Sequence, residues 1–200
     1  MAAHERRALV VFTVVLSGVV GGVLVSGLPR ALRPGGNPMD HSRFTVDHVR
    51  RTTDRPFEEV TRAFEQQLGQ FDPELYKSLA ASQDAETARS KIEAMAGPSG
   101  FMLFAAHNHG VLLRLAGQKR KAIRYVVGNP LFALQMTQHD IRASLYASLR
   151  VLIYEDEEGK TCLEYDRPTS LFGQFGNDRI GREAAMLDSK LEAMAAAATE

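Results

Sequence analysis

The clearest pattern in the chain lies near its C-terminus, where apolar residues follow one another at intervals of four and three. This spacing puts them on one face of a long amphipathic helix, which must pack against an apolar surface such as a sheet. A second stripe with similar spacing follows Pro56, a residue suited to the first turn of a helix. The first stripe is Ile180, Ala184, Leu187, Leu191, Met194 and Ala198, and the second is Phe57, Val60, Phe64, Leu68 and Phe71.

Strands are predicted in two parts of the chain. The segment RFTVDHVRR, residues 43–51, alternates in the way a half-buried strand does. After Gly100 come three short apolar runs, FMLFAAH, VLLRLAG and KAIRYVVG, which are separated by turn-forming residues. Two later runs flank an acidic turn with Gly159 near its tip, which predicts a hairpin.

The order of these elements predicts the fold class. Two shorter helices are expected over residues 73–82 and 84–96, between the first strand and helix and the later strands. The order is then strand, helices, four or five strands with one helical interruption, and a long helix. It predicts an α+β fold, in which an antiparallel sheet has its helices packed on one face.

Residues 8–28, which begin at Ala8 and end at Leu28, contain no charged side chain. As a helix they would span roughly 30 Å, about the thickness of the bilayer hydrocarbon. The run is longer than the apolar part of a cleavable signal, and its best cleavage-like triplet, Val25-Ser26-Gly27, is imperfect. We therefore expect residues 1–28 to be a single-pass anchor in the cytoplasmic membrane, with a cleaved signal segment as the alternative.

The residues after this segment separate it from a folded domain. Residues 29–42 contain three prolines and a Gly-Gly pair, which interrupt a helix and predict a linker. The globular domain is therefore expected over residues 43–200. Two arginines lie on each side of the apolar run, so the positive-inside rule favours neither orientation. Short N-terminal tails commonly stay in the cytoplasm, and we therefore expect this domain to be extracytoplasmic.

Charge and cysteine content exclude several classes of function. Four of the 24 basic residues and one of the 24 acidic residues lie in the first 35 positions, so the remainder carries 20 basic and 23 acidic residues. A mildly acidic domain is poorly suited to bind a phosphate backbone, and we expect no nucleic acid partner. The single Cys162 excludes an intramolecular disulfide and a cysteine-based zinc cluster.

The stretch GNPLFALQMTQHD, residues 128–140, is typical of a corner between a strand and a helix. Gly128 suits a positive φ, and Asn129 before Pro130 suits the N-cap. Met136 and His139 lie one turn apart, and together they would offer a thioether and an imidazole to a soft metal or haem iron. The favoured alternative is that Met136 fills the core and His139 meets the last carbonyls of the helix.

A second candidate site is the His-Asn-His-Gly segment. In a continuous strand His107 and His109 would project from one face and would bind a divalent metal, with His48 or His139 as a third ligand. In the favoured alternative, a turn at residues 108–110 breaks this spacing.

Other chemistry is sparse. Acidic neighbours at Glu164 and Asp166 disfavour a reactive thiolate at Cys162. The acidic run over residues 155–158 is typical of a solvated hairpin tip rather than of paired catalytic acids. The basic turn over residues 117–121 is typical of a solvated surface, and near a bilayer it would touch anionic headgroups.

Three segments carry a resemblance to a known family: RYVVGNPLFALQM, LYASLRVLIYEDEEGKTCLEYDRPTSLFGQFG and LDSKLEAM. Together they resemble the Domain of Unknown Function 302 family of bacteria and archaea, over approximately residues 44–198. The resemblance implies a fold like that of the TATA-box-binding-protein group, with the order strand, helix, four strands, helix. Because members can be dimeric, it also allows a homodimer. It implies no activity and no cofactor.

This chain departs from the family pattern in two places. Many members carry an Asp-His pair before the third strand, where this chain has Ala106-His107 or Asn108-His109. The helical segment over residues 73–97 is an enlargement relative to the shortest members of the family.

From the residues themselves we expect a membrane-tethered domain that binds a small ligand, a metal or a partner protein. The alternatives are an enzyme that uses His109 or His139 as an acid–base group, with or without a metal or haem, and a structural dimeric domain.

Overall fold

The protein is described by a computed structural model over residues 40–200, which contain one compact unit, Ser42–Glu200. The predicted anchor at 8–28 and most of the linker lie outside these residues. Between residues 40 and 200, no helix has the length and apolar character needed to cross a membrane.

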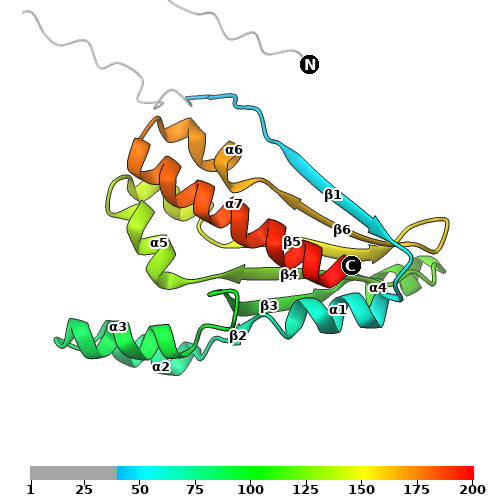
Figure 1. Cartoon of the computed structure of the whole chain (residues 1–200), viewed down its shortest axis with the longest axis horizontal. Helices are drawn as coiled ribbons and strands as arrows, with labels where there is room; N and C mark the ends of the chain where they lie inside the picture. Colours follow the sequence, from blue (N-terminus) through cyan, green and yellow to red (C-terminus); the bar gives the residue numbers. More distant parts are fainter. Residues whose placement is uncertain (1–39) are drawn as a thin grey trace, which may run out of the picture. The chain divides into compact units, whose positions relative to one another are not determined.

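The unit has an α+β fold built on a six-stranded sheet in the order β1-β6-β5-β4-β3-β2 (Figure 1). The strands are β1 (His48–Thr53), β2 (Gly69–Gln70), β3 (Met102–Asn108), β4 (Ala122–Gly128), β5 (Leu149–Glu155) and β6 (Thr161–Asp166). The α-helices are α1 (Phe57–Glu65), α2 (Pro73–Ala80), α3 (Ala85–Ala94), α4 (His109–Leu113), α5 (Pro130–Thr137), α6 (Pro168–Phe172) and α7 (Asp178–Thr199). Three 3₁₀ turns complete the fold, η1 (Arg114–Ala116), η2 (Ile141–Leu145) and η3 (Gly173–Phe175).

The core lies between the sheet and the two helices that the apolar stripes predicted. α1 and α7 pack on each other and on the same face of the sheet, so their periodic residues are buried. The exception is Phe71, which lies beyond α1 and is half-buried. Tyr125 of β4 is fully buried in this layer, and its ring packs on Phe64 of α1 with centroids 5.1 Å apart. The prediction of a C-terminal helix over the sheet is therefore confirmed, and six members of its stripe are buried: Ile180, Ala184, Leu187, Leu191, Met194 and Ala198.

The expectation of a purely antiparallel sheet is wrong at one edge. β2 pairs with β3 in parallel, through the register Gly69 with Met102, while all other strand pairs are antiparallel. The short strand follows from a close backbone crossing. A Cβ built on Gly69 would lie 1.9 Å from the carbonyl oxygen of Met95, and one on Gly97 would lie 2.3 Å from the nitrogen of Gly69. Two glycines let these segments meet, where the apolar stripe alone predicts a longer first helix.

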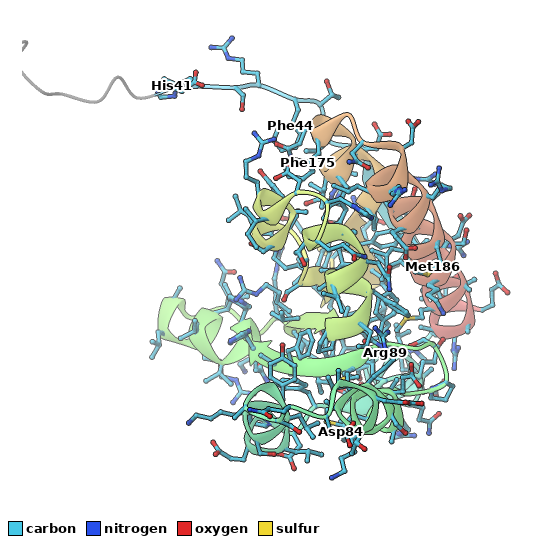
Figure 2. All side chains as sticks on the ribbon, turned by 90° about the vertical axis from the view of Figure 1, so that its left-hand side faces the viewer. His41, Phe44, Asp84, Arg89, Phe175 and Met186 are labelled. Carbon is cyan, nitrogen blue, oxygen red and sulfur yellow. The ribbon has the colours of Figure 1, made fainter. Side chains whose placement is uncertain are left out.

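Two predicted strands are displaced or replaced. β1 begins at His48 rather than at residue 43, because its pairing with β6 starts with His48 opposite Asp166. The run VLLRLAG is not a strand but forms α4 and η1, after Asn108 caps the helix by accepting from the backbone N–H of Val111. In Figure 2 the green α4 projects on the side of the sheet away from α7. The helices therefore do not all lie on one face.

The corner after β4 is built as predicted in one respect and not in another. Asn129 is the N-cap of α5, and its side-chain oxygen accepts from the N–H of Leu131 at 2.8 Å. Gly128 does not have the predicted positive φ, and within residues 40–200 the glycines that do are Gly100, Gly117, Gly159 and Gly176. Gly128 is required for space instead, since a Cβ there would lie 2.7 Å from Cε2 of Phe104.

Residues before β1 are held by aromatic contacts at the end of the domain where α6 and η3 lie. The ring of Phe44 meets Tyr146 edge to face at 6.0 Å, and Tyr146 in turn contacts Phe175 at 6.1 Å. Figure 2 shows Phe44 and Phe175 next to each other where the chain leaves the domain.

Candidate functional site

One face of the sheet is covered by α1 and α7, and the other carries mostly polar side chains. Because side chains alternate along a strand, the residues between the buried ones of β4, β5, β6 and β1 all point to this second side, here called the open face. Members of the open face include His48, Arg50, Thr52, His107, Arg124, Val126, Arg150, Leu152, Tyr154, Cys162, Glu164 and Asp166.

A hollow of about 350 Å³ lies at one end of the open face, and we call it the Arg150 hollow. Its floor comes from β4 and β5, and one wall comes from the turn that follows η2. The lining combines two guanidinium groups with apolar side chains. It is made of Arg124, Val126, Leu145, Tyr146, Ser148, Leu149, Arg150, Asp166 and Leu171.

The two arginines of this hollow are not neutralised by ion pairs. Val126 lies opposite Arg150 and Leu152 lies opposite Arg124 in the register of β4 and β5, so the arginines are diagonal neighbours on one face. Among residues 40–200, neither has a carboxylate oxygen within 4.0 Å. Among the described residues, the buried Nε of Arg124 has no hydrogen-bond partner, and its Nη2 lies 3.4 Å from Nδ1 of His107, a nitrogen that accepts when it carries no proton. The two guanidinium groups therefore bring uncompensated positive charge to the hollow.

Asp166 lines the same hollow but is bonded elsewhere. Its Oδ1 lies 2.9 Å from Nδ1 of His48, while Glu164 lies 3.2 Å from Nε2 of the same ring. The hydrogen bond to Asp166 is the largest effect on His48 and, with Glu164, raises the pKa of the imidazole above its usual 6.5 against the opposing effect of burial. This carboxylate is therefore committed to His48 rather than to the arginines.

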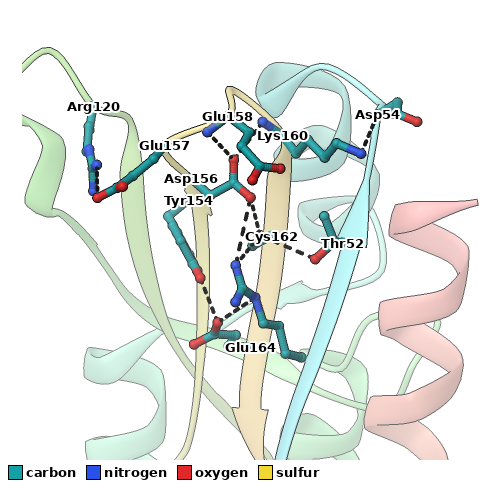
Figure 3. Close-up of polar contacts among 11 residues, drawn as sticks. Thr52, Asp54, Arg120, Tyr154, Asp156, Glu157, Glu158, Lys160, Cys162 and Glu164 are labelled. Carbon is teal, nitrogen blue, oxygen red and sulfur yellow. Dashed lines mark hydrogen bonds and ion pairs between the residues drawn. The ribbon is translucent and has the colours of Figure 1, made fainter.

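A polar network joins β1, β5 and β6 on the remainder of the open face (Figure 3). Glu164 accepts from the hydroxyl of Tyr154 at 2.6 Å and forms an ion pair with Arg50, whose Nε lies 3.2 Å away. Burial, followed by the bond to Glu164, raises the pKa of Tyr154, so the phenol stays protonated as a donor. Every group in this part of the network has a partner, which is typical of a structural network.

Cys162 lies inside this network and is fully buried. Its sulfur accepts from Nη2 of Arg50 at 3.3 Å, lies 3.5 Å from the hydroxyl of Thr52, and donates to Asp156 at 3.6 Å. None of these partners is a histidine that would serve as a base for a nucleophilic thiol. The structure thus places the thiol in a packed position.

The acidic hairpin tip is more ordered than a solvated turn requires. Oδ1 of Asp156 accepts from the backbone N–H groups of Glu158 and Lys160, while Glu157 is exposed and pairs with Arg120 at 2.9 Å. Burial alone would raise the pKa of Asp156, but these backbone hydrogen bonds, together with the bond from Cys162 and the charge of Arg50, hold the pKa below its usual 3.8. Asp156 therefore shapes the turn.

The structure separates the histidines that the sequence grouped. β3 ends at Asn108 and α4 begins at His109, so the strand spacing of His107 and His109 is broken. His107 is on the open face beside Arg124, whereas His109 lines a second hollow of about 350 Å³ together with Lys121, Arg124 and Tyr154. Within residues 40–200 no group of three or more His, Cys, Asp and Glu side chains is placed to hold a metal ion.

The predicted pair of Met136 and His139 is divided in the same way. Met136 is fully buried in the hydrophobic core, in agreement with the alternative that it fills space. His139 follows α5, where its backbone N–H donates to the carbonyl of Met136, and Asp140 caps η2 by accepting from Arg142. The corner itself borders an aromatic groove of about 290 Å³, lined by Phe71, Tyr76, Phe104, Asn129, Pro130, Ala133, Ala147 and Ser148.

Sequence analysis missed the arginines of the hollow, although a signal for them was present. In AIRYVVG and LRVLIYE, Arg124 and Arg150 alternate with the buried Tyr125 and Val151. A single polar residue on the second face of a central strand is common. Two arginines that β4 and β5 bring together, with no ion pair to either among residues 40–200, are informative, and only the pairing register shows this.

Comparisons with known proteins agree with this fold. The chain is similar to a solved protein described as "uncharacterized conserved protein DUF302 from Bacillus stearothermophilus", with a TM-score of 0.53 and 16% identity, over 75% of this chain and 96% of that one. No curated protein matches the chain. The family model described as "Domain of unknown function DUF302" matches residues 77–198, which is more than half of the sequence. The chain is therefore a member of the DUF302 family.

Proposed function

We propose that this domain binds a small amphiphilic anion, such as a carboxylate with a short apolar tail, in the Arg150 hollow. The observation that carries the proposal is the Arg124 guanidinium, whose buried Nε has no partner among residues 40–200, while Arg150, also without an ion pair there, is its diagonal neighbour on the sheet. Two cations on one face repel each other, and an anion between them would remove that cost and supply the missing acceptor.

The apolar part of the lining indicates the rest of the ligand. Val126, Leu145 and Leu171 offer aliphatic surface beside the arginines, and Ser148 and the Tyr146 ring lie at the same hollow. Leu145 is 79% exposed, so an alkyl tail would cover surface that the fold leaves in water. Pockets that combine apolar walls with a few polar groups are the usual form of small-ligand sites.

The proposal includes the placement of the domain. An uncharged segment over residues 8–28 followed by a Pro- and Gly-rich linker supports tethering to a membrane, with the domain on the extracytoplasmic side. Ligand binding does not depend on this tether.

Calorimetry with octanoate tests the ligand class. We expect a dissociation constant on the order of 0.1–1 mM for a ligand of this size, and much weaker binding of 1-octanol, which lacks the charge. Arg124→Gln and Arg150→Gln should each weaken binding about tenfold, the loss of one charge-assisted hydrogen bond. Arg182→Gln, an exposed arginine of α7 away from the hollow, is the matched control.

Two results would contradict the proposal. Equal binding of octanoate and octanol would show that the arginines do not recognise charge. Equal binding by all three arginine variants would place the anion elsewhere on the protein.

A further inference from the structure

The segment between β3 and β4 exposes an unusual amount of apolar surface. In α4 and η1, Val111, Leu112 and Leu115 are 51%, 59% and 87% exposed. Because residues three and four apart lie on one face of a helical segment, Leu115 is a neighbour of both others. Exposed apolar side chains gathered in this way mark an interaction surface rather than chance exposure.

The segment is held rigidly by other residues, so the fold does not need these three side chains. Asn108 caps the start of α4, and Gly117 ends η1 with a φ of 74° while Gln118 donates to the carbonyl of Leu113. Leu113 is the member that turns inward, where it lines the hollow that contains His109. The exposed residues are therefore presented on a pre-formed element.

Basic residues border the same segment. A hollow of about 490 Å³ is lined by Arg114, Gly117, Gln118, Lys119, Arg120 and Lys121. Arg120 pairs with Glu157 (Figure 3), and Lys121 pairs with Glu58 and Glu155. Within the described part of the chain, Arg114 and Lys119 have no carboxylate oxygen within 4.0 Å. These two cations are free for an anionic partner.

We propose that α4, η1 and the basic turn after them form a membrane-docking surface, which inserts Val111, Leu112 and Leu115 among the lipids of an anionic bilayer and places phosphate headgroups against Arg114 and Lys119. Apolar side chains beside cations match the two layers of a bilayer interface, where alkyl chains lie beneath phosphates. A second copy of the chain fits less well, because a two-fold contact would bring the same cations face to face. The proposal is independent of the Arg150 hollow and of residues 8–28.

The test uses residues 42–200, so that the apolar N-terminal segment does not itself bind lipid. This part contains the whole sheet and core. The solved DUF302 protein has the same fold, and the match covers 96% of that protein but only 75% of this chain, so the fold does not need the remaining residues. Binding is measured by co-sedimentation with vesicles of phosphatidylcholine, with and without one third phosphatidylglycerol. Thermal unfolding followed by circular dichroism confirms that each variant is folded.

We expect binding to the anionic vesicles and weaker binding to the neutral ones. Leu112→Ser with Leu115→Ser should lower the partition coefficient by about tenfold or more, since two leucines no longer leave water. Arg114→Gln with Lys119→Gln should lower it by roughly fivefold per charge and flatten its dependence on salt. Ile141→Ser is the matched apolar control, because Ile141 is 73% exposed in η2, beyond the opposite end of β4.

Four results would overturn the proposal. One is no binding to anionic vesicles by the folded domain, and another is an equal loss in the Ile141→Ser control. The third is a concentration-dependent dimer in sedimentation equilibrium that Leu115→Ser dissociates, which would make this surface a contact between copies. If 10 mM inorganic phosphate abolishes vesicle binding at constant ionic strength, the basic hollow is a site for a free anion and the lipid surface is rejected.

Discussion

The hydrogen bond between Tyr125 and Glu65 gives a quantitative test of how α1 is joined to the sheet. The ring of Tyr125 is fully buried, and its hydroxyl donates to Oε1 of Glu65, the last residue of α1, at 2.7 Å. Burial is the largest effect on this phenol and, together with the nearby carboxylate, raises its pKa. The phenol therefore acts only as a neutral donor, while Glu65 itself is exposed to water.

The two ends of this bond differ in what their removal leaves behind. Tyr125→Phe removes the buried donor and returns Glu65 to water, so we expect a loss of about 1 kcal/mol in the free energy of unfolding. Glu65→Ala leaves a buried hydroxyl without its acceptor and should cost more, about 2 kcal/mol. In the double variant both partners are gone, and its loss should be close to that of Tyr125→Phe alone.

Urea denaturation followed by circular dichroism measures these differences, provided that the slope against urea is unchanged. Glu65→Gln is the control, since it removes the negative charge from the end of the helix but keeps an acceptor oxygen. The reasoning would be refuted if Glu65→Ala were less destabilising than Tyr125→Phe. That result would show that water reaches the hydroxyl and that the packing of α1 on β4 is looser than the structure indicates.

Two further predictions concern the sheet. Because the pKa of His48 is raised above 6.5 in the folded protein, its bonds to Asp166 and Glu164 stabilise the fold fully below that pH and lose this contribution as the pH rises through the folded pKa. The difference in urea midpoint between wild type and His48→Gln should therefore shrink as the pH rises above 6.5, and a constant difference would contradict the role of His48. Gly69→Ala should cost about 3 kcal/mol or more, because its Cβ meets the backbone carbonyl of Met95, whereas Gly181→Ala in α7, where a Cβ meets nothing within 4 Å, should stabilise by about 0.5–1 kcal/mol. Equal effects of the two glycine changes would show that β2 is not held by a close backbone crossing.

Several elements were predictable because their signals are local. The N-cap at Asn129 and the helix that Pro130 begins depend on a few consecutive residues. The hairpin of β5 and β6 follows from two apolar runs around a turn with Gly159. The buried stripe of α7 repeats often enough to be read without a partner surface.

The errors arose where distant residues decide the local structure. VLLRLAG has the composition of a strand, but no neighbouring strand pairs with it, and the cap at Asn108 makes it a helix. β2 pairs with β3 at a place where the backbone of Gly69 lies against that of Gly97, nearly thirty residues later. Gly128 suits a special backbone conformation, yet what excludes a side chain there is the ring of Phe104 from another strand.

The sequence by itself therefore determined the family resemblance, the α+β class and most of the helices and strands, since periodicity and capping act over a few residues. Only the tertiary structure decided which polar residues meet. The register of β4 with β5 brings Arg124 and Arg150 to one hollow, and that of β1 with β6 gives Asp166 to His48 instead. The physical reason is that strand pairing joins residues far apart in the chain, and a shift by a single residue would send each of these side chains to the opposite face.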